Sequence, residues 1–368
     1  MAFISDGITR AGMLTGKTPK LLNVYINTSG ACTNRCYMCP GRAAKTHNKP
    51  MSDSVFSTVV QRLAEYDFDG NLHFYGQNEP LTDPNIFKRI QYAKQRLPKT
   101  SLHMISNFTI LSDSMLEKLL QMPLDRLVNS IYALDAESYE KICGRPNYIK
   151  AITNQVKFIK RWSRKKKYPF LVFLIDSEHN RSDQKFMEWF LRKLPVTKTE
   201  RSPLFHTRNV LPRESSHHNF GICLFQNMLI NGEGNTSICP FDHDCEMFSG
   251  NILHMGIPEI MNSRDARRIR CNILYKKGSR YPDFCSVCDY ANENKMLYFF
   301  LPQDKIRRKI QAAAGFDNGF SQKQFRTVSV NSDSKIMKKQ VWFDHIFADE
   351  THIPETIALC REKFVKNG

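Results

Sequence analysis

Long hydrophobic segments are missing from this sequence of 368 residues. No apolar run reaches the about 18 residues that a membrane-spanning helix needs, and the N-terminus lacks the apolar stretch of a secretory signal peptide. We therefore expect a cytoplasmic protein without membrane contact. Hydrophobic residues still make up 41% of the chain, which is enough to bury a core. The length predicts one large domain or two ordinary ones.

Acidic residues are also scarce, with 36 Asp and Glu against 53 Lys and Arg and a net charge of +17. Such an excess bears on partners rather than on fold, and it suits an anionic small molecule, an acidic peptide or nucleic acid. Many of these cations form one basic run. We interpret this run as the C-terminal end of a helix with a face exposed to solvent, and not as a nucleic-acid site, because few aromatic residues interleave with it. That run contains Lys157, Lys160, Arg161, Arg164, Lys165, Lys166 and Lys167.

Cysteine, by contrast, is plentiful, with 11 residues. In a reducing compartment this number argues for metal ligation rather than disulfides. Cys32, Cys36 and Cys39 follow a predicted strand with the spacing C-x3-C-x2-C. Three thiolates on one short loop can hold three irons of a 4Fe–4S cube and leave the fourth iron open to a chelating molecule. A zinc site is the alternative, although zinc motifs usually pair C-x2-C with a second such pair.

Strand-like and helical segments alternate through the first 200 or so residues, about five or six times. This alternation predicts a parallel α/β barrel or open sheet. In a parallel barrel the chemistry lies at the C-terminal ends of the strands, where the cysteine loop and a turn at 76–79 are both expected. The predicted strands are 21–29, 72–75, 102–106, 127–133 and 170–175, and the predicted helices include 52–64, 84–97, 112–120 and 183–194.

These motifs resemble the radical S-adenosylmethionine (radical SAM) enzymes, which carry C-x3-C-x2-C after the first strand. Residues 74–81 (FYGQNEPL) resemble the family's Gly-x-Gly-Glu-Pro-Leu turn, and Ser106-Asn107 resembles its Thr-Asn-Gly turn. Residues 130–144 resemble the fourth strand and the helix after it. The resemblance implies a partial parallel (β/α)6 barrel and cluster ligation by Cys32, Cys36 and Cys39. It also implies reductive cleavage of S-adenosylmethionine, bound at the open iron, to a 5′-deoxyadenosyl radical.

The resemblance also implies residues that contact S-adenosylmethionine. Glu79 would accept hydrogen bonds from the cofactor's ammonium group, and the turn before it would follow the methionyl end. Met38 either packs on the adenine or only fills the loop. Tyr132 stands where the family frequently has aspartate, so no acid is assigned there. The full set of implied cofactor contacts is Met38, Gly76, Gln77, Asn78, Glu79, Asn107 and Ser130.

Beyond about residue 205 the alternation stops and cysteines become frequent. The spacing of Cys223, Gly234 and Cys239, with a later C-x2-C pair, resembles the SPASM family, whose C-terminal domain carries auxiliary 4Fe–4S clusters. Position 294 is Asn where the full pattern has Cys, so one auxiliary cluster is implied, as in the shortened twitch variant. A structural zinc on the same ligands is the alternative. Those ligands are Cys223, Cys239, Cys285 and Cys288.

We therefore expect three parts: a radical SAM partial barrel at 1–204, a SPASM/twitch-like domain at 205–299, and a C-terminal extension of unknown role at 300–368. Within the second part, Cys245 is a candidate thiol hydrogen donor or alternative ligand. Asp242 is either a base that acts on the substrate or a turn residue.

Three further cysteines lie outside these motifs, and one of them, Cys360, has no assigned role. Cys143 is expected on a helix as a small buried hydrophobe. Cys271 is a weaker candidate than Cys245 for a thiol hydrogen donor or an alternative ligand beside the auxiliary cluster.

The implied reaction is removal of a hydrogen atom from a polar small molecule, namely a sugar, cyclitol or nucleoside, including anionic ones. If the auxiliary cluster accepts the substrate's electron, the outcome is dehydrogenation. If a thiol returns hydrogen from the opposite face, the outcome is epimerisation. An external donor such as flavodoxin or ferredoxin would supply the reducing electron.

Three other functions remain open. Peptide maturation ranks second and not first. The first predicted strand begins at residue 21, which leaves no room before it for the leader-peptide-binding domain that peptide-modifying relatives often carry. RNA modification driven by the basic run is less favoured. A simple electron carrier is disfavoured by the open iron.

Overall fold

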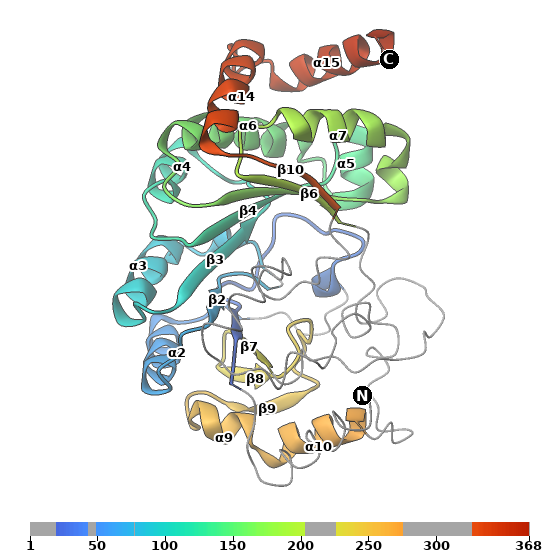
Figure 1. Cartoon of the computed structure of the whole chain (residues 1–368). Helices are drawn as coiled ribbons and strands as arrows, with labels where there is room; N and C mark the ends of the chain where they lie inside the picture. The colour runs from blue at the N-terminus through green and yellow to red at the C-terminus, as the bar shows by residue number, and fades with distance from the viewer. Residues whose placement is uncertain (1–19, 43–48, 77, 203–225, 275–325, 368) are drawn as a thin grey trace, which may run out of the picture.

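The computed structural model describes residues 20–42, 49–76, 78–202, 226–274 and 326–367. Its centre is a ten-stranded sheet in the order β10-β6-β5-β4-β3-β2-β1-β7-β8-β9 (Figure 1). Strands β1 to β6 lie side by side in chain order and run parallel, as expected for a (β/α)6 arrangement. These strands are β1 (Asn23–Ile26), β2 (Asn71–His73), β3 (Ser101–Ser106), β4 (Arg126–Ile131), β5 (Phe170–Ile175) and β6 (Lys198–Ser202).

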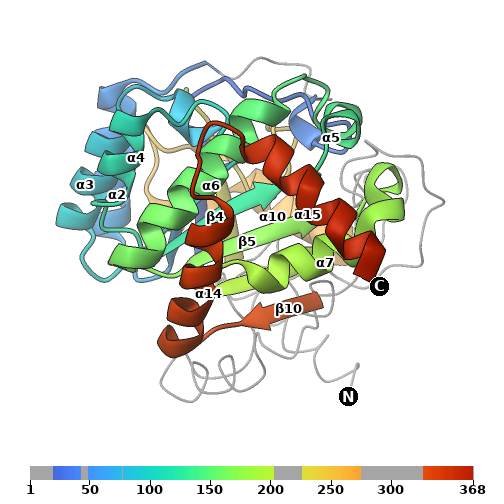
Figure 2. The same ribbon diagram turned by 90° about the horizontal axis from the view of Figure 1, so that it is seen from above.

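Helices follow the strands along the chain and cover the outer face of the sheet (Figure 2). They are α2 (Asp53–Glu65), α3 (Ile86–Arg96), α4 (Asp113–Leu119), α5 (Ala136–Cys143), α6 (Tyr148–Lys165) and α7 (Gln184–Lys193), with short 3-10 turns η1 (Pro40–Arg42), η2 (Pro80–Thr82) and η3 (Glu178–Asp183). Serine side chains cap α2 and α4, since Ser52 and Ser112 accept the Val55 and Met115 N–H groups. The predicted α/β fold of mostly parallel strands is therefore confirmed.

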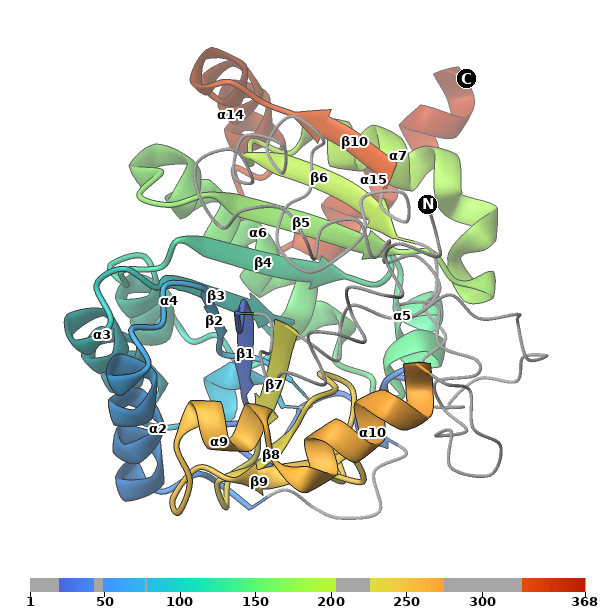
Figure 3. The same ribbon diagram turned by 60° about the horizontal axis from the view of Figure 1, so that its bottom comes forward.

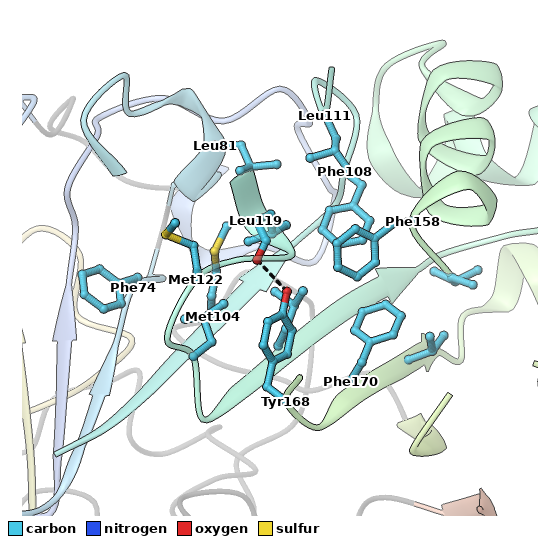
Figure 4. Close-up of a cluster of buried hydrophobic side chains, with 14 of the residues drawn as sticks. Phe74, Leu81, Met104, Phe108, Leu111, Leu119, Met122, Phe158, Tyr168 and Phe170 are labelled. Carbon is cyan, nitrogen blue, oxygen red and sulfur yellow. Dashed lines mark hydrogen bonds between the residues drawn. The ribbon is translucent and has the colours of Figure 1, made fainter. Parts of the chain in front are cut away.

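The main hydrophobic core lies between the sheet and these helices. Strand residues such as Val24, Leu72 and Val172 are fully buried on this side. Figure 4 shows Phe108, Phe158 and Phe170 packed together, with ring centroids 4.8 Å apart for the first two. Because side chains alternate along a strand, the neighbouring positions face the inside of the barrel.

The inner face of the sheet is polar at its β7–β1–β2 side. The Asn23 amide donates to Asn227 Oδ1 (2.9 Å) and accepts from Asn71 Nδ2 (2.9 Å). Tyr25 stacks on His73, with ring centroids 4.4 Å apart. Hydrogen-bonded amides can be buried at little cost, so this layer links three strands without an apolar core.

Strand β7 (Asn227–Ile230) pairs in parallel with β1 and turns back into β8 (Asn235–Ser237), with which it forms an antiparallel hairpin. Gly234 in this turn has φ +80°, a conformation that favours glycine. Strand β9 (Phe248–Asn251) and helices α9 (Ile257–Met261) and α10 (Arg264–Leu274) follow (Figure 3). One sheet thus continues across the domain boundary predicted near residue 205.

The C-terminal region adds β10 (Arg326–Val330), antiparallel to β6, and two helices, α14 (Asp333–Ile346) and α15 (Ile353–Asn367), which contact α6. Figure 2 shows both helices over the α6–α7 side of the sheet. No helix among the described ranges is long and apolar enough to cross a membrane.

The basic run does lie at the end of α6, but its face is not simply solvated as expected. Lys160 is buried, donates to the Phe347 carbonyl (2.7 Å) and pairs with Glu350 (2.9 Å). Arg164 pairs with Asp344 (3.1 Å). The C-terminal region therefore covers and partly neutralises these cations.

Candidate functional site

The cysteine loop follows β1 and is tied to the turn at Glu79 and to the end of α5. The Glu79 N–H donates to the Ala31 carbonyl (2.9 Å). The Arg35 and Tyr37 N–H groups donate to the carbonyls of Cys143 (2.8 Å) and Ile142 (3.1 Å). The last carbonyls of a helix have no partner within it, so the end of α5 is a ready acceptor for this loop.

Helix α5 ends at Gly144, whose left-handed backbone conformation is needed next to the cysteine loop. Gly144 has φ +64°, and a β-carbon there would lie 2.7 Å from the Arg35 carbonyl oxygen. Any other residue would strain the backbone and press on the cysteine loop.

The three cysteines share this loop but differ in exposure. As whole residues, Cys36 is buried, Cys39 is half-buried and Cys32 is exposed. The thiol of Cys39 is itself enclosed, and burial raises its pKa to about 11. Thiols must lose their protons to bind iron, so cluster binding would release a proton from this site. Within the described ranges, no three His, Cys, Asp or Glu side chains are grouped as a site for a single metal ion.

Glu79 is a buried carboxylate beside the loop. It accepts hydrogen bonds from Ser106 Oγ (2.6 Å), the Asn107 N–H (2.9 Å) and the Leu81 N–H (3.3 Å). Burial nevertheless raises its pKa to about 7, because these neutral donors only partly replace water. A cation bound here would stabilise the charged form.

The turn before Glu79 also suits a ligand. Asn78 Nδ2 donates to Ser29 Oγ (3.4 Å), whereas Asn78 Oδ1 is buried with no hydrogen-bond partner among the described residues. A β-carbon at Gly76 would lie 2.0 Å from Asn27 Oδ1, so any larger residue would require the Asn27 side chain to move. Gln77 lies outside the described residues. A buried acceptor without a donor, next to a buried carboxylate, fits an ammonium group such as that of S-adenosylmethionine.

Asn107 holds the first cysteine. Its Nδ2 donates to Thr33 Oγ1 (3.0 Å) and lies 3.9 Å from the Cys32 sulfur, and its Oδ1 accepts the Thr109 N–H (2.9 Å). Its own N–H binds Glu79, so this one residue connects the carboxylate to the cysteine loop. The side chain predicted to contact the cofactor is thus already engaged with the protein.

The other predicted cofactor contacts differ in position. Met38 is 9% exposed and belongs to the main hydrophobic core, as the loop-packing interpretation expects. Ser130 lies near the end of β4 and is buried, and its carbonyl accepts from Gln155 Nε2 (3.2 Å).

The cysteine-rich region is described only in part. Cys239 is buried, and its N–H donates to Ser237 Oγ (3.2 Å). Cys245 has φ +52°, an uncommon conformation for a residue other than glycine. The predicted ligands Cys223, Cys285 and Cys288, and the side chain of Cys271, lie outside the described residues.

Asp242 lies at the centre of this region. Its carboxylate accepts from Ser237 Oγ (2.7 Å), the Glu246 N–H (3.0 Å) and the Met247 N–H (2.6 Å). These contacts make Asp242 a residue that shapes the turn and favour that interpretation over a base.

Sequence reasoning missed one contact at the site. Cys143, expected only as a buried hydrophobe, is fully buried, and its carbonyl accepts the N–H of Arg35 (2.8 Å), the residue before Cys36. Nothing in the spacing of two residues so far apart in the chain indicates this contact.

Comparisons with known proteins agree with this geometry. The family model of the radical SAM superfamily matches residues 26–178. The model of the SPASM iron–sulfur cluster-binding domain matches residues 222–289. A curated relative from Niallia circulans, the S-adenosyl-L-methionine-dependent 2-deoxy-scyllo-inosamine dehydrogenase, is 20% identical over 111 residues. The match covers 30% of this chain and 44% of that relative, less than half its length.

Three solved structures share the fold. BtrN in complex with AdoMet and 2-DOIA has a TM-score of 0.50 at 16% identity, over 76% of this chain and 98% of BtrN. Streptococcus suis SuiB bound to precursor peptide SuiA has a TM-score of 0.55 at 12% identity, over 71% of this chain and 69% of SuiB. Native anSMEcpe with bound AdoMet has a TM-score of 0.54 at 13% identity, over 93% of this chain and 99% of anSMEcpe.

The C-x3-C-x2-C loop, the buried carboxylate beside it and the two family matches lead to one assignment, in which the cofactors are 4Fe–4S clusters and S-adenosylmethionine. The chain belongs to the radical SAM superfamily and carries a C-terminal SPASM iron–sulfur domain.

Proposed function

We propose that Cys32, Cys36 and Cys39 ligate the cluster that cleaves S-adenosylmethionine, and that Glu79 and Asn78 bind the ammonium group of the cofactor. The observation that carries this proposal is the link from Glu79 to the cysteine loop, made by its own N–H on Ala31 and by Asn107. When bound, the cluster and the cofactor supply a 5′-deoxyadenosyl radical that removes hydrogen from a C–H bond. The role of the protein is to orient the cofactor and the substrate and to exclude water.

The proposed substrate is a polar small molecule: a sugar, cyclitol or nucleoside, including anionic ones. Tyr25 and Tyr75 meet edge to face on the inner side of the sheet, with ring centroids 5.7 Å apart. Aromatic faces with a few polar neighbours are typical of small-molecule sites. The name of the Niallia circulans relative and the 2-DOIA bound in the BtrN complex support a cyclitol-like substrate.

A peptide is the second candidate substrate, supported by the precursor peptide SuiA bound to SuiB. RNA has less support, because part of the basic run on α6 is engaged by the C-terminal region. We also propose that the protein acts in the cytoplasm with flavodoxin or ferredoxin as electron donor.

The proposed outcome is dehydrogenation or epimerisation, which depends on the region from 205 to 299. A single auxiliary cluster on Cys223, Cys239, Cys285 and Cys288 would accept an electron in a dehydrogenation. The unusual backbone of Cys245 supports a fixed position for its thiol, which an epimerase needs for hydrogen return.

The first test is anaerobic incubation of reconstituted protein with S-adenosylmethionine and dithionite. We expect 5′-deoxyadenosine, and about eight irons per chain if there are two cubes. The Cys36→Ala variant should abolish the product, whereas Cys360→Ala, a cysteine on α15, should not. Zinc on the loop, or no 5′-deoxyadenosine from the intact protein, would refute the proposal.

The second test identifies the substrate class and outcome. Polar metabolite pools and peptide pools are incubated separately with the reduced enzyme, and product masses are compared. Loss of two hydrogens from a metabolite indicates dehydrogenation, and solvent deuterium at a product carbon indicates epimerisation. Cys245→Ala should leave a dehydrogenase largely active and stop an epimerase before hydrogen return. Change confined to the peptide pool would overturn the small-molecule proposal.

A further inference from the structure

The turn after β3, residues 106–109, supplies two of the three hydrogen bonds to the Glu79 carboxylate. Ser106 Oγ donates to one carboxylate oxygen (2.6 Å), and the Asn107 N–H donates to the other (2.9 Å). The third donor, the Leu81 N–H, is more distant (3.3 Å) and comes from the segment that follows Glu79 itself. The shape of the turn 106–109 therefore decides how the carboxylate is held.

This turn has a shape that the backbone does not favour by itself. Phe108 has φ +58°, a left-handed conformation that suits glycine and strains other residues. The Phe108 N–H donates to Ser106 Oγ (3.1 Å), so the hydroxyl that binds Glu79 is tied to this strained residue. Backbone strain of this kind persists only where the surrounding structure enforces it.

Amide side chains from two other elements hold the turn in this shape. Asn129 of β4 is fully buried, and its Nδ2 donates to the Ser106 carbonyl (3.1 Å). Asn154 of α6 is half-buried, and its Nδ2 donates to the carbonyls of Phe108 (2.8 Å) and Thr109 (3.4 Å). The strained residue is thus bound from outside the turn by α6.

The next residue of α6 continues this network. Gln155 is buried, and its Nε2 donates to the Ser130 carbonyl (3.2 Å) and, over a longer contact, to the Asn107 carbonyl (3.5 Å). Each of the four carbonyls of the turn therefore has a side-chain amide as donor. Buried carbonyls need donors in any turn, but here the same four residues carry the donors to a buried carboxylate.

We propose that Asn129 and Asn154 are positioning residues for S-adenosylmethionine, which fix the turn 106–109 so that its two donors hold the Glu79 carboxylate where the ammonium group binds. This inference rests on the proposed contact between Glu79 and that ammonium group. It extends the cofactor site to two side chains that no sequence motif indicates.

The test is anaerobic calorimetry of S-adenosylmethionine binding to the reconstituted enzyme, with variants compared at equal iron content. Asn154→Leu removes the amide at similar size and should weaken the affinity about three- to tenfold, the value of one hydrogen bond. Asn129→Leu should change it in the same direction. Asn331→Leu is the matched control and should leave the affinity unchanged. Asn331 is also buried and donates to a backbone carbonyl, that of Val196 (2.6 Å), but it lies between β10 and α14.

A double-mutant cycle with Glu79→Gln separates positioning from general destabilisation. If the two asparagines act through the carboxylate, Asn154→Leu should change the affinity by less than about twofold in the Glu79→Gln background. An equal loss in both backgrounds would overturn the proposal, because the effect would then not depend on Glu79.

The other outcomes are equally distinct. Unchanged affinity in both asparagine variants, together with weaker binding in Glu79→Gln, would refute the positioning role and leave the cofactor contact intact. If Glu79→Gln binds S-adenosylmethionine as tightly as the unmodified protein, the proposed contact of Glu79 is wrong and this inference fails with it. If Asn129→Leu does not fold, the half-buried Asn154 alone decides.

Discussion

Glu79→Gln is the substitution whose effect the structure defines best, because Glu79 is buried beside the cysteine loop and burial raises its pKa from 4.5 to about 7. At about 1.4 kcal/mol per pKa unit, this corresponds to about 3 kcal/mol in the free energy of unfolding. The folded state holds the proton more tightly than the unfolded state. Its stabilising contribution is therefore complete below pH 4.5 and is lost as the pH rises to about 7.

Glutamine cannot ionise, so the variant lacks this pH dependence. Urea unfolding of the metal-free, reduced protein, followed by circular dichroism, should show the difference between variant and unmodified protein change by about 3 kcal/mol from pH 4.5 to 7.5 in favour of the variant. A fixed offset from the altered hydrogen bonds with Ser106 and Asn107 is expected at every pH. A difference that does not vary with pH would refute the reasoning.

The same carboxylate should govern cofactor affinity in the reconstituted enzyme. A protonated Glu79 has no charge to offer an ammonium group, so binding of S-adenosylmethionine should weaken as the pH falls through about 7. In Glu79→Gln the affinity should be lower and nearly independent of pH in this range. Calorimetry under anaerobic conditions measures both, and a parallel pH dependence in the two proteins would contradict the proposed contact.

Three further substitutions test other contacts. Gly144→Ala should cost about 1–2 kcal/mol from left-handed strain and should lower iron content, because its β-carbon would press on the Arg35 carbonyl; normal melting temperature and iron content would contradict this. Phe108→Ala should cost about 3–5 kcal/mol in urea unfolding, since the ring is fully buried; a cost below about 1 kcal/mol would show that the cluster of Figure 4 repacks freely. Lys160→Met should cost about 2 kcal/mol through its lost bonds to the C-terminal region, and unchanged stability would show that this contact contributes little.

The sequence predicts the first five strands well because their apolar residues contrast with polar turns. Strand β6 was not predicted, and its composition explains why. Its segment, KTERS, is polar at every position. The charge of Arg201 is satisfied by partners that only the fold provides, namely Asp176 (2.7 Å) and Glu188 of α7.

The site shows the same limit at the level of single side chains. Motif spacing indicates that Glu79 and Asn107 lie near the cofactor, but not that Asn107 already holds Thr33. Phe108 stands where the family's turn has glycine, with φ +58°. Its ring contacts Phe158 in the core, and this burial offsets the backbone strain.

Helix α5 shows how distant parts of this chain act on the same loop. Its first turn is capped by Asp135, which accepts the Ser138 N–H (2.8 Å) and lies 3.6 Å from Arg361 of α15. Its last carbonyls hold the residues around Cys36. A helix of eight residues therefore lies between the C-terminal region and the proposed cluster ligand. Because α15 also binds Asp183 through Arg361 (2.7 Å), it fixes α5 against the segment after β5. Helix α15 thus contributes to the position of the site through its contacts with the start of α5 and with Asp183.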